Sequence, residues 1–107
     1  MSFTGNENHD FTLSEASEWT ENYRDAHPSS VIGQYFGKSA IEAVLTQTGC
    51  VGIRLYYALD GDGAKQLIMV GVDEDENDLY EGLIKERSCP SPPYSSSSNP
   101  LNSSSKK

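Results

Sequence analysis

The segment Gly33–Ser39 has the composition of a loop that could hold a phosphate group, since it reads Gly-Gln-Tyr-Phe-Gly-Lys-Ser. A phosphate-binding loop needs Gly-x4-Gly-Lys-Ser/Thr, in which backbone amides surround the phosphate. The interval is one residue short here, Ile32 stands where the first glycine is required, and the two aromatic residues are too bulky for such a loop. We therefore expect no nucleotide site, and assign Gly37 and Ser39 to the junction between two structural elements.

Two acidic loops carry oxygen ligands at spacings that calcium sites use. The run Asp73–Asn77 fills the first three ligand positions of a helix-flanked calcium loop, but Asp78 stands at the glycine position and Ile84 at the position of the bidentate glutamate. The loop Asp60–Gly63 departs from the pattern sooner. Neither loop lies between two expected helices, so both are predicted to be solvated turns without a metal ion.

The chain contains two cysteines, Cys50 and Cys89, and two histidines, His9 and His27. A nucleophilic cysteine needs a lowered pKa and a base nearby, and a zinc site needs about four ligands at characteristic spacings. Neither arrangement can be assembled from these four residues. The sequence therefore predicts no catalytic residue, no metal ligand and no cofactor.

Arg54, Tyr56 and Tyr35 are the candidates for ligand binding. Arg54 and Tyr56 are two residues apart in an alternating segment and so share one face of the expected strand. If that face is partly open, they could bind an anion or an acidic partner, with Tyr35 beside them. The structural alternative is that Arg54 pairs with a neighbouring carboxylate and Tyr56 covers apolar surface. Trp19 is the candidate for a protein contact, because it flanks the apolar stripe of the first helix.

Two helices are expected. Thr12 and Glu15 form a capping box, and apolar residues then recur at spacings of three and four until His27-Pro28, which predicts a helix over 13–26. A second helix is predicted over 39–48, with Gly49 as its C-terminal cap. The segment 31–36 fits either a short edge strand or a helical turn.

The remaining elements are expected to be strands. Residues 50–59 alternate, and one set is predicted to point into the core: Val51, Ile53, Leu55, Tyr57 and Leu59. A turn at 60–63 leads to a second strand over 65–73, which is apolar on both faces and therefore expected to be central. Residues 79–87 fit a weaker third strand or a short helical turn. This order predicts an α+β fold in which two helices pack on an antiparallel meander of two to three strands, in two layers.

The length of 107 residues suffices for one domain. Residues 1–10 and the Ser/Pro-rich tail 88–107 have too few apolar side chains to offset the entropy of ordering, so both are predicted to be disordered. Residues 11–87 are then a single α+β domain. A domain this small is near the lower limit for independent folding, which favours a protein partner or a second copy.

The chain has 16 acidic and 8 basic residues and a net charge of −8. The basic residues form no stripe, so nucleic acid and anionic membranes are not expected as partners. There is no signal-peptide pattern and no apolar run long enough to span a bilayer. Two cysteines make a poor disulfide framework, and we expect a reducing, cytoplasmic setting.

Three segments together resemble a small family of uncharacterised bacterial proteins: Gly49–Tyr57, Lys65–Asp73 and Asn77–Leu79. The resemblance covers about residues 11–94 and implies a single small domain without a known activity. It also implies a Pro-rich end containing cysteine, which Cys89-Pro90 matches. No second cysteine follows, so a paired-thiol role is not carried over.

These observations favour a non-enzymatic protein-interaction or regulatory domain with an acidic surface, with a homodimer as one form of it. The alternative left open is a small-ligand-binding protein or enzyme. Its pocket would lie between the sheet and the helices, around Arg54 and Tyr56.

Overall fold

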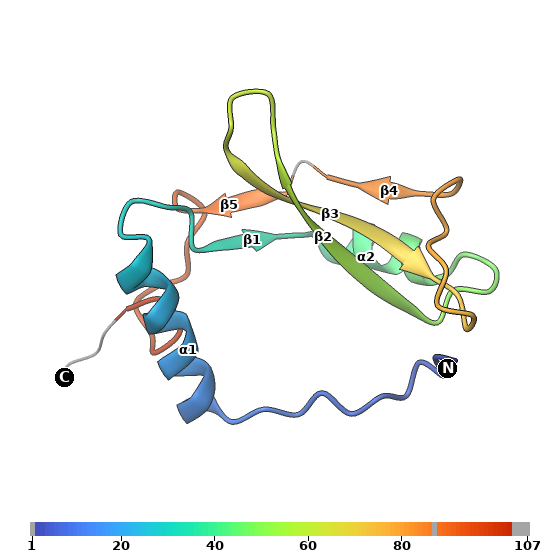
Figure 1. The fold of residues 1–107 in the computed structure, drawn as a ribbon, viewed down its shortest axis with the longest axis horizontal. Coiled ribbons are helices and arrows are strands. Elements are labelled where there is room, and N and C mark those ends of the chain that lie inside the picture. Colours follow the sequence, from blue (N-terminus) through green and yellow to red (C-terminus); the bar gives the residue numbers. More distant parts are fainter. Residues whose placement is uncertain (1, 87, 104–107) are drawn as a thin grey trace. The chain divides into compact units, whose positions relative to one another are not determined.

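The computed structural model describes residues 2–86 and 88–103, and the chain divides into two units, Met1–Asn8 with Gln34–Cys89 and His9–Gly33 with Pro90–Lys107. The elements are α1 (Leu13–Ala26), β1 (Gly33–Tyr35), α2 (Lys38–Leu45), β2 (Gly52–Leu59), β3 (Lys65–Val72), β4 (Ile84–Lys85) and β5 (Cys89–Ser91) (Figure 1). Two helices and a β2–β3–β4 meander make an α+β fold, as predicted.

The hairpin of β2 and β3 is regular, and the two strands pair antiparallel over all eight residues of each. Asp60 closes its turn. The Asp60 N–H donates to the Ala64 carbonyl at 3.0 Å, and its Oδ1 accepts from the amides of Asp62 and Ala64 at 2.9 and 3.0 Å. Gly63 has a φ of 83°, which a glycine adopts without strain. The Asp-Gly-Asp-Gly signal therefore forms the expected hairpin turn.

β3 is the central strand of the meander, as predicted from its two apolar faces. Its second half, Met69–Val72, is buried, and with Val44 of α2 it supplies the buried apolar core of the described residues. β4 has only two residues, and a further isolated bridge joins Val72 to Asp78. The weak pattern over 79–87 thus forms a very short third strand, and Arg87 itself lies outside the described residues.

The chain connection after α2 packs closely against β3. Gln47 Nε2 donates to the Val44 carbonyl at 2.9 Å, and Gln47 Oε1 accepts from the Leu83 N–H at 2.8 Å. A Cβ atom at Gly71 would lie 2.9 Å from Cys50 Sγ and 3.0 Å from Gln47 Nε2. The missing side chain at Gly71 is therefore what lets this connection approach the sheet.

The two helices differ in how well the sequence predicts them. α1 covers Leu13–Ala26 as expected, and Thr12 Oγ1 accepts from the Glu15 N–H at 3.0 Å, as a capping box requires. α2 spans Lys38–Leu45 and not 39–48, and Gly49 lies in the turn that follows rather than at the C-cap. The second helix thus ends with its last apolar residue, Leu45, and not just before Gly49.

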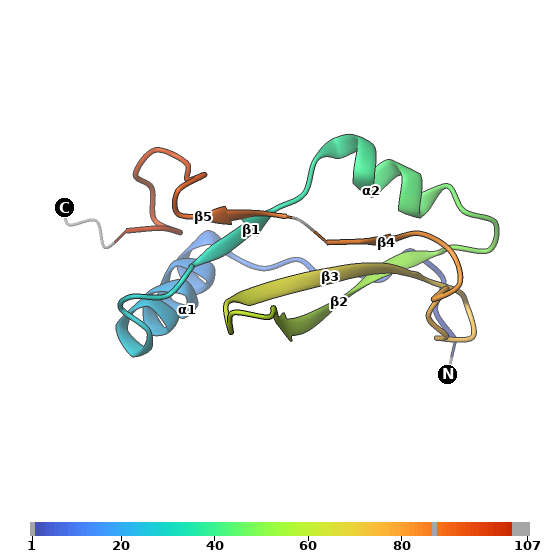
Figure 2. The same ribbon diagram turned by 90° about the horizontal axis from the view of Figure 1, so that it is seen from above.

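The inward face predicted for 50–59 is wrong for its second half. Residues at the start of the segment are half-buried, whereas Leu55, Tyr57 and Leu59 are 48, 94 and 69% exposed. The cause is length, because an eight-residue helix extends about 12 Å and an eight-residue strand about 26 Å. α2 lies over the end of the meander where β2 begins, and the hairpin continues past it (Figure 2).

The second unit contains α1 and the C-terminal segment. Arg24 Nη1 donates to the Leu101 carbonyl at 2.8 Å, and the Tyr23 hydroxyl donates to the Val31 carbonyl at 3.2 Å. No residue of α1 is buried. Within residues 2–86 and 88–103, neither helix has the length and apolar character needed to cross a bilayer.

The segment 31–36, left open by the sequence, contains the strand β1. β1 pairs with β5 in a two-stranded sheet, and the boundary between the two units passes through both strands. β5 belongs to the tail 88–107, whose disorder stays a prediction, and residues 104–107 lie outside the described part of the chain.

We expect Gly71→Ala to lower the free energy of unfolding by about 1–3 kcal/mol, because the added methyl group would overlap Cys50 and Gln47. Gly52→Ala is the matched control, since no atom lies within 4 Å of the carbon it adds. Its unfolding free energy should change by less than about 0.5 kcal/mol. Urea denaturation of both variants measures the difference, and equal losses in the two would contradict this packing.

Candidate functional site

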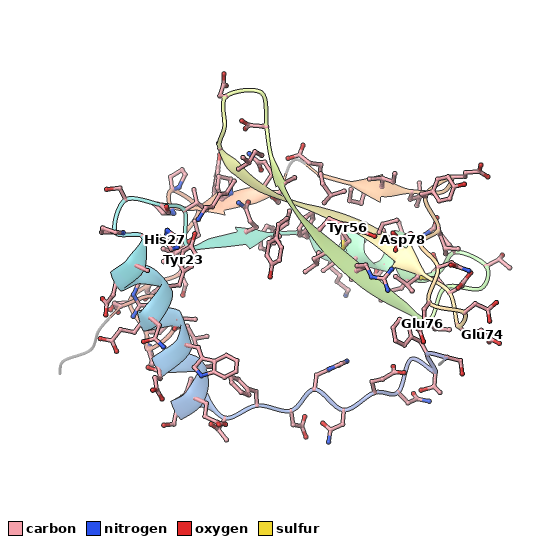
Figure 3. All side chains as sticks on the ribbon, viewed as in Figure 1. Tyr23, His27, Tyr56, Glu74, Glu76 and Asp78 are labelled. Atoms are coloured by element: carbon pink, nitrogen blue, oxygen red, sulfur yellow. The ribbon has the colours of Figure 1, made fainter. Side chains whose placement is uncertain are left out.

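Arg54, Tyr56 and Asp78 form a hydrogen-bonded group that we call the carboxylate clasp. Arg54 Nη1 donates to Asp78 Oδ1 at 2.5 Å, and the Tyr56 hydroxyl donates to Asp78 Oδ2. Figure 3 shows Tyr56 and Asp78 next to each other. Both oxygens of one carboxylate are therefore held by two donors from alternate positions of β2.

The loop between β3 and β4 presents Asp78 to these donors. Asp73 organises it, since its Oδ1 accepts from the amides of Asp75 and Asn77, each at 2.9 Å, and its carbonyl accepts from the Glu76 N–H at 3.0 Å. Glu76 has a φ of 71°, a left-handed conformation that costs a residue with a side chain on the order of 1 kcal/mol. The acidic run is thus a structured turn built on Asp73.

The clasp changes the proton affinities of its members. The hydrogen bond to Asp78 raises the pKa of Arg54, and burial partly opposes this effect. The hydrogen bond to Asp78 also raises the pKa of Tyr56, with burial adding to the rise and the positive charge of Arg54 opposing it. The structure therefore favours a neutral phenol and a charged guanidinium around one carboxylate.

In both acidic loops, an aspartate side chain accepts hydrogen bonds from backbone amides of the same loop. The amide of Ala64, followed by the side chain of Gln66 and the amide of Asp62, lowers the pKa of Asp60. Asp73 Oδ1 likewise accepts hydrogen bonds from two backbone amides. Within the described residues, no group of three or more His, Cys, Asp or Glu side chains is arranged to hold a metal ion.

The structure brings together two of the three residues predicted to bind a ligand. Arg54 and Tyr56 lie on one face of β2, and Arg54 pairs with a carboxylate as the structural alternative predicted. Tyr35 belongs to β1, in the two-stranded sheet, and its side chain is 61% exposed. Trp19 is 62% exposed on α1 of the second unit, and its ring lies 4.6 Å from that of Phe11.

Both thiols are free and half-buried. Cys50 Sγ donates to the Gly52 carbonyl at 3.2 Å and faces the space above Gly71, where it fills the position that a side chain at Gly71 would need. His27 stacks against Tyr23 at 4.6 Å between ring centroids. These contacts are those of structural side chains.

The sequence pattern does not identify Asp78 as the partner of Arg54. Asp78 stands at the glycine position of an incomplete calcium loop, and alternation within 50–59 points to no particular carboxylate for Arg54. The hairpin register holds the missing signal, because the isolated bridge joins Asp78 to Val72 and Val72 pairs with Gly52, two residues from Arg54. The short loop after β3 thus brings Asp78 next to Arg54 and Tyr56.

The second candidate site is the outer edge of β2. In an antiparallel ladder, hydrogen-bonded pairs recur at every second residue. The bond from Asp60 N–H to the Ala64 carbonyl therefore indicates that the even-numbered residues of β2 direct their backbone N–H and C=O groups toward β3. The bond from the Leu79 N–H to the Gly71 carbonyl, at 2.8 Å, supports this direction, because it lies on the side of β3 that faces away from β2. The backbone groups directed away from the sheet are those of Ile53, Leu55, Tyr57 and Leu59.

The side chains of three of these residues are also exposed. Leu55, Tyr57 and Leu59 occupy alternate positions, so they form one apolar row, which we call the β2 edge stripe. β2 is the terminal strand of the order β2-β3-β4. An edge strand with unpaired backbone groups and an exposed apolar row is a template for pairing with another strand.

No family model, curated protein or solved structure that was compared with the chain matches it. The resemblance to a small bacterial family therefore stays a prediction. The carboxylate clasp and the β2 edge stripe are the two features of the described residues that bear on function.

The clasp predicts a specific loss of stability at alkaline pH. Because folding raises the pKa of Tyr56 above its ordinary value of about 10, the native state holds the phenolic proton more tightly than the unfolded chain does. Stability from this bond is complete at neutral pH and is lost as the pH rises through and beyond about 10. Thermal melting between about pH 8 and 11 should therefore show a smaller decline for Tyr56→Phe than for the natural chain.

Tyr57→Phe is the control for this measurement, because it removes a phenol from the opposite face of the same strand. It should decline with pH as the natural chain does. The same alkaline decline in Tyr56→Phe and Tyr57→Phe would contradict the role given to Tyr56.

Proposed function

We propose that this chain is a non-enzymatic protein-interaction domain that binds its partner by strand addition at the outer edge of β2. In strand addition, the backbone groups of an exposed edge supply affinity and alternate side chains supply specificity. The observation that carries the proposal is that β2 has both outward backbone groups and an exposed apolar row. Three of the four residues with outward backbone groups form the apolar row, and Tyr57 is 94% exposed.

The absence of protection along β2 supports this use. Edge strands are commonly shielded by lysine, proline or inward charges that prevent unintended pairing. The only charged residue of β2 is Arg54, which lies on the opposite face from the β2 edge stripe and is bound by Asp78. An edge left open in this way fits a surface that functions in binding.

The charge of the chain fits the same proposal. A net charge of −8 favours solubility and discourages non-specific association. The β2 edge stripe itself carries no charge, so binding would be concentrated there. We also propose a cytoplasmic setting, since the chain has two free thiols and no disulfide between them.

The alternative function, a small-ligand site around Arg54 and Tyr56, has weaker support. The two donors would suit a carboxylate or a phosphate, but Asp78 already accepts from both of them. An external anion would have to displace this carboxylate. The interaction function requires no such displacement, and we prefer it for that reason.

The proposal predicts a loss of binding that is confined to the edge. The full chain is immobilised, and the proteins that it retains from a cell extract are compared with those retained by Tyr57→Lys. We expect at least one retained protein to be reduced about tenfold or more by Tyr57→Lys, because an exposed aromatic residue at the centre of an interface contributes strongly to affinity.

Tyr80→Lys is the matched control, because Tyr80 is 70% exposed and lies outside the strands. It introduces the same change of side chain and charge, and it should leave retention unchanged. Thermal melting establishes that both variants are folded. If the two variants retain the same proteins as the natural chain, the edge of β2 is not the binding surface.

A further inference from the structure

We infer that the partner at the β2 edge is a second copy of this chain, with the two β2 strands paired antiparallel about a two-fold axis. The inference rests on the proposed function and names its partner. The result would be a continuous six-stranded sheet made of two β4-β3-β2 meanders, in which neither copy keeps an exposed β2 edge.

The hydrogen-bond alternation allows a specific register. Backbone groups of odd-numbered residues point outward, so a two-fold pairing must bring odd residues opposite odd residues. An axis through Tyr56 does this and pairs all four residues whose backbone groups point outward. Leu55 then lies opposite Tyr57 of the second copy, and Ile53 lies opposite its Leu59.

This register also places the β2 edge stripes of both copies on one face of the joined sheet. Side chains of directly opposed residues in antiparallel strands are about 5 Å apart, and aromatic–aliphatic pairs of this kind are favourable. Leu55 and Tyr57 of each copy would thus cover each other. The second copy would thus give each β2 edge stripe an apolar neighbour along its outer flank.

The distribution of charge favours β2 over the other surfaces of the chain as the place where a second copy binds. Two chains of net charge −8 repel each other over most of their surfaces. β2 contains no acidic residue, and its single cation, Arg54, is paired with Asp78. The register puts Arg54 opposite Ala58 and not opposite a second Arg54, so no like charges face each other across the joined edge.

The area available indicates a weak dimer. The exposed parts of Leu55, Tyr57 and Leu59 amount to on the order of 400 Å² in each copy. Edge pairing buries only part of this area, so two copies, with the backbone edges added, stay below about 1,200 Å², the lower end of stable interfaces. The dimer should therefore dissociate at concentrations on the order of micromolar to millimolar.

Sedimentation equilibrium of the full chain from about 10 µM to about 1 mM tests the inference. We expect the average mass to rise from that of one chain towards that of two. Tyr57→Lys should keep the mass of one chain throughout, because it places a cation against the apolar row of the other copy. Tyr80→Lys should behave like the natural chain.

A second variant tests the backbone directly. Tyr57→Pro removes an N–H that points away from β3, so the hairpin can keep its own hydrogen bonds while the joined edge loses two. We expect this variant to remain folded, as judged by its thermal transition, and to remain monomeric. A dimer that persists in both Tyr57 variants would use another surface and would overturn the inference.

Cross-linking tests the register. In a background with Cys50→Ala and Cys89→Ala, mild oxidation of an equal mixture of Leu55→Cys and Tyr57→Cys chains should give disulfide-linked dimers several-fold faster than oxidation of either variant alone. Opposed residues in hydrogen-bonded pairs are about 5.5 Å apart between Cα atoms, which a disulfide can bridge. Equal rates in the three samples would overturn the register.

The outcomes separate this inference from the proposed function. A chain that is monomeric at about 1 mM overturns the second copy as the partner. If Tyr57→Lys nevertheless loses a protein that Tyr80→Lys retains, strand addition stands with a different occupant. If the retention experiment fails as well, both proposals fall.

Discussion

The difference in rise between a helix and a strand governs this structure. Eight residues of α2 extend about 12 Å, whereas the eight residues of β2 beside it extend about 26 Å. One helix of this length can cover only half of the hairpin on which it packs. The buried apolar residues of the described chain lie in α2 and the second half of β3, as Val44, Met69, Val70 and Val72.

That limit produces a meander with two unlike halves. At the α2 end, Gly71 and Gln47 fit together closely and the sheet is enclosed. At the turn end, the odd-numbered side chains of β2 have no covering layer. The β2 edge stripe is therefore a consequence of where α2 stops, and it is the surface on which the proposed interaction rests.

Much of this architecture is readable in the sequence, because the decisive signals are local. The capping box at Thr12 and Glu15 sets the start of α1, and the turn at Asp60 sets the hairpin and its register. The error concerned the end of α2, because its apolar pattern ends at Leu45 but no helix breaker follows before Gly49. Whether Leu55 is covered depends on the length of a different element, so alternation within β2 could not decide it.

In the carboxylate clasp, too, one part follows from a local pattern and the other part does not. Alternation alone placed Arg54 and Tyr56 on a common face. Their partner Asp78 is 22 to 24 positions away along the chain, and it arrives there through the loop that Asp73 organises. A contact over that separation depends on strand register and loop geometry together, which no single stretch of the sequence encodes.

The single tryptophan adds a practical consequence. Trp19 is the only tryptophan of the chain, and it lies on α1 in the second unit beside Phe11. The meander contains tyrosines and no tryptophan. Indole emission therefore reports directly on the surroundings of α1, and a transition of the hairpin would have to be followed through its own tyrosines, Tyr56 and Tyr57.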